Sequence, residues 1–135
     1  MDSDIVGQIG QGLLVFLGIH PKDSASQITW MAEKIANLRI FEDSNGAMNL
    51  SLFDINKEML IVSQFTLYGD CRKGRRPGFS NAAQPDIAEP LYLQFISKVE
   101  QMGIRTAAGI FGAMMEVQLI NDGPVTLLLD SDKTF

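Results

Sequence analysis

Polar side chains cluster where one buried strand is predicted to end. Residues 59–65 read Met-Leu-Ile-Val-Ser-Gln-Phe, a short apolar run that is typical of a buried strand. Ser63, Gln64 and Thr66 lie at its end, and polar groups in a core are costly unless they are hydrogen-bonded. Strand alternation predicts Gln64 and Thr66 on one face and residues 63, 65 and 67 on the other. The pattern fits a candidate site, and it equally fits a strand that runs out into solvent.

A second candidate is the sequence Asn-Asp-Gly-Pro-Val-Thr at residues 121–126. Gly123-Pro124 between two predicted strands indicates a turn, and a plain hairpin turn is the simpler interpretation. A cis bond at this position would instead fix two backbone carbonyls in one direction. The residues alone leave both alternatives open.

A third candidate is a short basic cluster formed by Arg72, Lys73, Arg75 and Arg76. These are four of the eleven Lys and Arg residues of a chain whose formal net charge is −5. Arginine can bind phosphate oxygens through two parallel hydrogen bonds. The cluster therefore favours contact with a polyanion over the alternative, a loop that is simply solvated.

The chain has one cysteine and one histidine, Cys71 and His20. Positive charge beside Cys71 would lower the pKa of its thiol, but His20 is the one imidazole that could serve as its base and lies far away in sequence. A cysteine hydrolase is therefore the less favoured alternative. A single cysteine excludes an intramolecular disulfide and a single histidine excludes His-rich zinc patterns, so we expect no metal and no cofactor.

The hydrophobic periodicity predicts helices and strands in alternation. A capping box at Ser24 and Gln27 starts a helix over 24–38, in which Trp30 lies off the apolar stripe and could contact a second surface. A second helix should start near Asp86 or Ala88 and end near 102, and Pro90 favours the later start because proline is tolerated in a first turn. A turn is predicted at 43–46, and strands are predicted at 13–19, 59–65, 104–107, 115–120 and 125–129. The continuous apolar run at 13–19, bounded by glycine, predicts a strand that is buried on both faces. This order suggests an α+β fold with a curved, mixed sheet.

Length and composition limit the class of protein. With 135 residues, 46% hydrophobic and 20% charged, residues 1–135 are expected to form a single globular domain. No apolar run is long enough for a membrane span and no basic leader opens the chain, so we expect a soluble, cytoplasmic protein. The negative net charge argues against non-specific coating of nucleic acid.

Taken together, these segments resemble the D-aminoacyl-tRNA deacylases, also known as D-tyrosyl-tRNA deacylases. Residues 63–67 are similar to the family signature SQxxL, and residues 121–126 are similar to its NxGPxT signature. The resemblance covers almost the whole chain from Val6 onward. Further matching segments, in the same order and at the family spacing, are 36–42, 73–79 and 111–115.

The resemblance implies a homodimer of curved-sheet, barrel-like subunits with two main helices and with sites at the dimer interface. It implies hydrolysis of the ester between a D-amino acid and the terminal adenosine of tRNA, and release of glycine from mischarged tRNA. In the family the Gly-Pro bond is cis and is inserted into the partner's site. Carried over, Gly123-Pro124 would be a chiral filter whose two carbonyls hold the α-amino group and leave no room for an L side chain.

The resemblance also assigns roles to individual residues. Those assigned to catalysis are Ser63, Gln64, Phe65 and Thr66. Those assigned to substrate binding and the chiral filter are Asn121, Gly123, Pro124, Thr126, Phe79 and Met115. Those assigned to tRNA binding are Arg72, Lys73, Arg75 and Arg76.

The residue types in the two signatures limit the mechanism that this resemblance implies. Ester hydrolysis needs an activated nucleophile and stabilisation of the oxyanion. Thr66 is the obvious hydroxyl, but neither signature contains a His, Lys or Glu to act as its base. We favour backbone N–H groups near Phe65 that polarise the ester carbonyl, with the 2′-hydroxyl of the RNA assisting the attack. The alternative is a non-catalytic nucleic-acid-binding module on the same fold.

The chain departs from the family pattern in two places. Family members usually open with an additional strand that carries a Gln-Arg pair, and no counterpart precedes Asp4 here. Either the start of the sequence is placed too late, or the protein lacks this edge strand. Met114 occupies a position where many relatives have a polar residue, which would alter the rim of the pocket.

Overall fold

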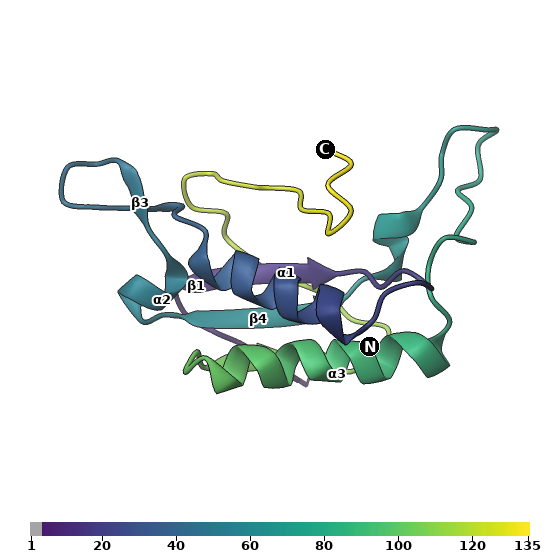
Figure 1. Cartoon of the computed structure of the whole chain (residues 1–135), viewed down its shortest axis with the longest axis horizontal. Helices are drawn as coiled ribbons and strands as arrows, with labels where there is room; N and C mark the ends of the chain where they lie inside the picture. The colour runs from purple at the N-terminus through teal and green to yellow at the C-terminus, as the bar shows by residue number, and fades with distance from the viewer. Residues whose placement is uncertain (1–3) are drawn as a thin grey trace.

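The computed structural model describes residues 4–135 (Figure 1). The expectation that the chain opens without a basic leader concerns residues that lie outside the described ones. The chain is a mixed α/β structure with a parallel sheet and a separate antiparallel pair of strands. In chain order its elements are β1 (Gly12–Leu17), α1 (Ala25–Asn37), β2 (Phe41–Glu42), β3 (Met48–Leu50), α2 (Leu52–Ile55), β4 (Glu58–Ser63), the 3₁₀ turn η1 (Phe65–Tyr68), α3 (Pro85–Gln101) and β5 (Thr106–Ala108).

The main sheet consists of three parallel strands in the order β1-β4-β5. Leu13 lies opposite Met59 and Val15 lies opposite Ile61, and all four side chains belong to the core. On the other face of β1, Phe16 remains 39% exposed. The prediction that the first strand is buried on both faces is therefore wrong, because the helices cover one face of the sheet.

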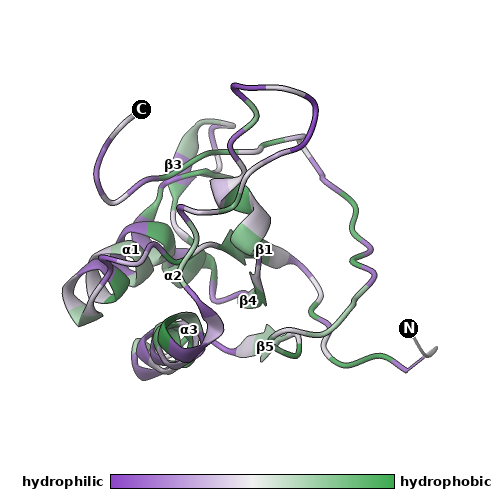
Figure 2. Cartoon of the chain, turned by 90° about the vertical axis from the view of Figure 1, so that its right-hand side faces the viewer, coloured by the Kyte–Doolittle hydropathy of each residue, from purple (hydrophilic) through white to green (hydrophobic). Residues whose placement is uncertain are grey.

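Helices α1 and α3 lie side by side against the same face of the sheet (Figure 2). The predicted capping box starts α1, since the Ser24 N–H donates to Oε1 of Gln27 at 2.8 Å. The predicted apolar stripe of Ile28, Ala32 and Ile35 is buried. The helix over 24–38 is thus confirmed to within one residue at each end.

Helix α3 begins at Pro85, earlier than predicted, and contains Pro90 in its interior. Pro85 takes the first helical position, where no backbone donor is needed. Pro90 lacks the N–H that would bond to the carbonyl of Asp86, and the exposed Asp86 can bond to water instead. The preference for a later start at Ala88 is therefore wrong.

Strands β2 and β3 form a hairpin around the predicted turn at 43–46. A carboxylate oxygen of Asp43 accepts a hydrogen bond from the Ala47 N–H at 3.1 Å, which closes the turn. Helix α2 was not predicted, because four residues are too short to show a helical period. Its start is marked by Ser51, whose hydroxyl accepts from the Asp54 N–H at 3.1 Å.

The chain after β5 forms no strand within the described residues. It leaves the sheet on the side away from the helices and returns past β3 to the C-terminus (Figure 2). The strands predicted at 115–120 and 125–129 are therefore wrong for the single chain, because extended backbone becomes a strand only beside a neighbour. Several large apolar side chains of this segment are exposed: Met114, Leu119, Ile120, Leu127 and Leu128. Across residues 4–135, no helix is long and apolar enough to cross a membrane.

Candidate active site

The first signature forms the 3₁₀ turn η1 at the carboxyl end of β4. The strand ends at Ser63, and the Gln64 N–H still donates to the carbonyl of Leu17 on β1 at 2.8 Å. The chain then turns, with the Leu67 N–H donating to the Gln64 carbonyl at 3.2 Å. The predicted alternation of faces through residues 63–67 is therefore wrong, because the polar residues leave the strand for a helical turn.

Two backbone amides at the start of η1 are free. Within residues 4–135, neither the Phe65 N–H nor the Thr66 N–H has a hydrogen-bond acceptor. The cause is general, because the first amides of a helical turn have no preceding carbonyl to bond. Phe65 is 56% exposed, so this turn lies at the surface of the fold. Such a pair can hold a negatively charged oxygen.

Gln64 and Thr66 are joined through their side chains. The side-chain amide of Gln64 donates to the Thr66 hydroxyl oxygen. The hydroxyl has no other side-chain partner within the described residues, and in particular no carboxylate, imidazole or amine. A donor on the oxygen does not remove its proton, so the geometry provides no base for a threonine nucleophile.

Phe79 joins this end of the site although it comes from the next loop. Its ring meets the ring of Phe65 edge to face, with the centroids 5.2 Å apart and the planes at 72°. It also lies close to the backbone of Gly69, directly after η1. The structure thus brings two polar side chains, Gln64 and Thr66, next to two aromatic ones, Phe65 and Phe79.

The second signature forms an exposed turn with a cis Gly123-Pro124 bond. The side chain of Asn121 braces this turn from both sides. Its carbonyl oxygen accepts from the Val125 N–H at 3.1 Å, and its amide donates to the Thr126 hydroxyl at 2.8 Å. Of the two alternatives that the sequence left open, the cis bond is the one present.

The two signatures do not meet within one chain. In Figure 1, η1 is the short teal helix at the right, whereas the yellow-green segment around residues 121–126 bends at the left. No hydrogen bond within residues 4–135 joins the two. Met115 is separate again, with its sulfur packed against Gly109 after β5.

The basic cluster lies on a loop between η1 and α3. Paired backbone hydrogen bonds between Asp70 and Gly78, of 2.7 and 2.9 Å, close the loop. The Arg72 guanidinium donates to both carboxylate oxygens of Asp70 and lowers the pKa of that carboxyl to about 2. In the described chain, Lys73, Arg75 and Arg76 are exposed and form no ion pair. These three cations are available to a ligand, and Arg72 is engaged with its own chain.

The cysteine alternative finds no support in the geometry. Cys71 is exposed, and His20 packs its ring against Tyr68 with the centroids 5.6 Å apart. Within residues 4–135, no hydrogen bond joins Cys71 to His20, and no group of three His, Cys, Asp or Glu side chains could hold a metal.

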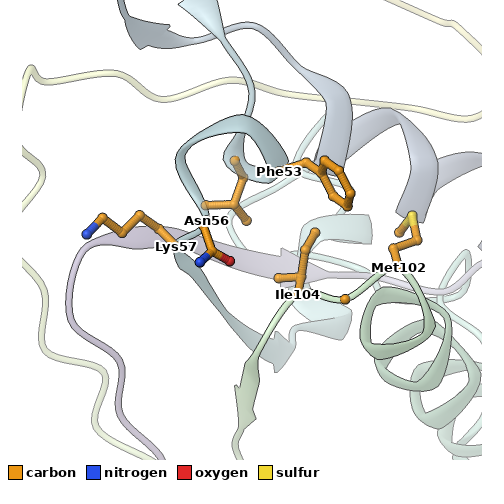
Figure 3. A pocket seen from close by; sticks show the side chains of 7 residues that line it. Phe53, Asn56, Lys57, Met102 and Ile104 are labelled. Carbon is orange, nitrogen blue, oxygen red and sulfur yellow. The ribbon is translucent and has the colours of Figure 1, made fainter.

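A cavity of about 240 Å³ opens elsewhere, between α2 and the end of α3 (Figure 3). None of the residues assigned to the site lines it. The lining residues are Leu52, Phe53, Asn56, Lys57, Met102, Gly103 and Ile104. The cavity is therefore separate from the candidate site.

Comparison with known proteins decides the family. The sequence profile described as D-Tyr-tRNA(Tyr) deacylase matches residues 1–130. The chain belongs to this deacylase family. A D-aminoacyl-tRNA deacylase of Clostridioides difficile (strain 630) is 58% identical over 135 residues, which cover 100% of this chain and 91% of the relative.

Two further relatives differ in their names. A Bacillus subtilis (strain 168) relative, 56% identical over 131 residues that cover 97% of this chain and 99% of the relative, is named an inactive D-aminoacyl-tRNA deacylase. A solved structure named c-Myc DNA Unwinding Element Binding Protein is 40% identical, with a TM-score of 0.84 over 90% of this chain and 83% of that one. One protein similar to this chain is therefore named as lacking the activity, and another is named for binding DNA.

One contact that anchors η1 was not predicted from the sequence, that between Gly18 and Tyr68, the last residue of η1. Tyr68 packs its ring against the backbone of Gly18, and both lie outside the residues that the signature assigns. A glycine at the end of a predicted strand was the available signal, because such a glycine often marks a close approach.

Proposed function

We propose that this chain hydrolyses the ester bond of D-aminoacyl-tRNA, releasing the free D-amino acid and tRNA, and that it also removes glycine from mischarged tRNA. The observation that carries the proposal is the pair of free amides at Phe65 and Thr66, beside the linked side chains of Gln64 and Thr66. Membership of the deacylase family supports the choice of substrate. The site of action is the cytoplasm, where tRNA is charged.

The mechanism follows from two features of η1 in the described chain: its first two amides are free to bind an oxyanion, and the Thr66 hydroxyl has no base beside it. Water attacks the ester carbonyl carbon, and the developing oxyanion binds to the free amides of Phe65 and Thr66, each such donor being worth roughly 10²–10³ in rate. The bond from carbon to the 3′-oxygen then breaks, and the proton of the attacking water passes to that oxygen through the neighbouring 2′-hydroxyl. The chain provides orientation and the oxyanion site, and the RNA provides the group that moves the proton.

This role of the RNA has its own test. A substrate esterified at the 3′ position whose terminal adenosine has hydrogen in place of the 2′-hydroxyl should bind normally and should not turn over. Single-turnover kinetics on the deoxy and ribo substrates provides the comparison. Normal cleavage of the deoxy substrate would exclude assistance by the RNA.

The chiral filter is proposed to come from a second subunit. The Gly123 and Pro124 carbonyls hold the α-amino group, and their rigid backbone leaves no room for an L side chain. In one chain this turn lies away from η1, and large exposed apolar patches are typical of interfaces. Ile120 and Leu128 are 94% and 71% exposed on either side of the turn. A homodimer of curved, barrel-like subunits would cover them and complete two sites.

The tRNA backbone is proposed to bind the loop closed by Asp70 and Gly78. Lys73, Arg75 and Arg76 are exposed there without an ion pair in the described chain, on the same side as η1. Neutralising all four basic residues, including Arg72, should weaken tRNA binding and flatten its salt dependence. The log–log slope should fall by roughly one unit for each phosphate that the loop no longer binds.

The direct test is loss of ester from D-aminoacyl-tRNA and from its L counterpart, incubated with the chain under the same conditions. We expect rapid loss from the D substrate and little from the L substrate. Equal rates would contradict the chiral filter, and no loss from either would contradict the activity.

A second candidate function is a nucleic-acid-binding module without catalysis. It is favoured by the name of the 40% identical solved structure and by the relative named inactive. It predicts tRNA or DNA binding that depends on loop 70–78, together with no ester loss from the D substrate.

A further inference from the structure

We propose that Gly18 and Tyr68, the last residue of η1, are positioning residues whose contact holds η1 and its free amides in place without contacting substrate. The inference rests on the proposed function for its catalytic consequence. Its structural basis is the contact between a glycine backbone and an aromatic ring at the base of the turn.

Gly18 leaves just enough room for the Tyr68 ring. A Cβ added at Gly18 would lie 3.1 Å from Cε2 and 3.2 Å from Cδ2 of Tyr68, and 3.3 Å from the Gln64 carbonyl oxygen. Gly18 does not have a positive φ, so space and not backbone conformation is the constraint. A methyl group there must displace the ring, or the carbonyl of Gln64 directly before η1, by a few tenths of an ångström.

The Tyr68 ring also packs against the imidazole of His20. The imidazole contacts the ring with the centroids 5.6 Å apart and the planes at 57°. Hydrogen bonds hold both the backbone and the ring of His20. Its backbone N–H donates to Oδ2 of Asp23 at 2.8 Å, and its ring Nδ1 accepts from the backbone N–H of Lys22 at 3.1 Å. The ring therefore packs both against the backbone at Gly18 and against an imidazole that is itself held by hydrogen bonds.

A similar contact lies directly after η1, at Gly69. A Cβ added at Gly69 would lie 3.0 Å from the Thr66 carbonyl oxygen and 3.1 Å from the Phe79 ring. Two contacts between a glycine and an aromatic ring therefore pack around η1, Gly18 with Tyr68 and Gly69 with Phe79. Of the two rings, Phe79 also faces Phe65 and the site, whereas Tyr68 packs towards β1.

The Tyr68 ring acts through its shape and not through its hydroxyl. Within residues 4–135 the hydroxyl has no hydrogen-bond partner. Burial, and then the charges of Asp23, Asp130 and Asp132, raises the pKa of Tyr68 to about 12. The phenol thus stays neutral and cannot act as a base near neutral pH.

Small displacements of η1 are expected to affect the chemical step more than substrate binding. Misplacing catalytic groups by about 1 Å can cost roughly a hundredfold in rate. Gly18→Ala should therefore lower kcat by about tenfold or more while leaving KM within about twofold.

The test uses four variants of the full chain and two readouts. Gly18→Ala and Tyr68→Leu should each lower kcat and shift the amide ¹⁵N–¹H signals of Phe65 and Thr66. Tyr68→Phe, which keeps the ring, should behave as the unsubstituted chain in both readouts. Gly10→Ala is the matched control, because a Cβ there would have 4.0 Å to its nearest neighbour, Glu58.

A double variant separates positioning from a general loss of stability. If the clash with the ring is the cause, Gly18→Ala combined with Tyr68→Leu should be no slower than Tyr68→Leu alone. Additive losses, or amide signals of Phe65 and Thr66 that stay in place in Gly18→Ala, would overturn the proposal. If the unsubstituted chain has no deacylase activity but the amide signals shift as expected, the positioning holds and the proposed function fails.

Discussion

The two signature turns differ in what holds them in place. The turn η1 is anchored in its own chain, through the bond from Gln64 to Leu17 and the packing of Tyr68 on Gly18. The turn at Gly123-Pro124 is exposed. Within residues 4–135, the side-chain hydrogen bonds that brace it both come from Asn121. This difference fits the proposed dimer, in which one half of the site is a property of one folded chain and the other half requires assembly.

The largest expected effect comes from preventing assembly. Ile120→Asp combined with Leu128→Asp should abolish deacylation, by about a thousandfold or more, because the residues left on one chain lack the filter. The far-UV circular dichroism should not change, since both side chains are exposed in the single chain. Sedimentation should show a monomer in place of a dimer.

The control for this experiment is Leu93→Asp on α3. Leu93 is 54% exposed and lies away from the C-terminal segment in sequence. It should leave both the dimer and the activity intact. A dimer that persists in the Ile120/Leu128 variant would contradict the role of this segment.

The next largest effect should come from deleting one free amide of η1. Phe65→Pro removes the N–H at the first position of the turn, where proline is tolerated. Loss of an oxyanion donor should lower kcat by roughly 10²–10³. Phe65→Ala, which keeps the amide and loses the ring, is the comparison, and an equal loss in both variants would assign the effect to the ring.

A smaller effect is expected at the brace of the exposed turn. Asn121→Ala removes the bonds to Val125 and Thr126, and should reduce the rate on the D substrate by about tenfold. Discrimination between the D and L substrates should fall with it. Its neighbour Asp122 has no side-chain hydrogen bond within the described residues, so Asp122→Ala is the matched control. Equal kinetics for the two variants would show that the brace is dispensable.

The smallest effect is expected for Thr66→Ala. The hydroxyl has no base in the structure, so its loss should slow single-turnover deacylation by no more than about tenfold. An essential nucleophile would instead be worth several orders of magnitude. A Thr66→Ala variant with no measurable activity would restore threonine as the nucleophile.

Part of this architecture could be predicted from local sequence. The helix α1 follows from a capping box and a buried stripe, both of which act within a few residues of each other. The two signatures mark the segments that we propose as the site, and within the first of them Gln64 and Thr66 do interact. Local patterns succeed here because the interactions that decide the structure are themselves local.

The rest depends on contacts that a local pattern does not contain. The apolar alternation at 115–120 and 125–129 predicts extended backbone, but a strand also needs a neighbour, and within residues 4–135 the chain provides none. The end of β4 at Ser63 could not be predicted, because a polar run fits both a solvated strand and a 3₁₀ turn. The packing of Tyr68 on Gly18 joins positions fifty residues apart, and no spacing rule reports such a contact.

The most direct test of a site shared between subunits is complementation of two defective variants. One chain carries Phe65→Pro and the other carries Asn121→Ala with Gly123→Val, and each is assayed alone and after subunit exchange. A mixed dimer has one intact site, so an equal mixture should recover on the order of a quarter of the activity of the unsubstituted chain. An exchanged mixture that stays as inactive as its two components would contradict the account, because η1 and the Gly123-Pro124 turn would then have to act within one chain.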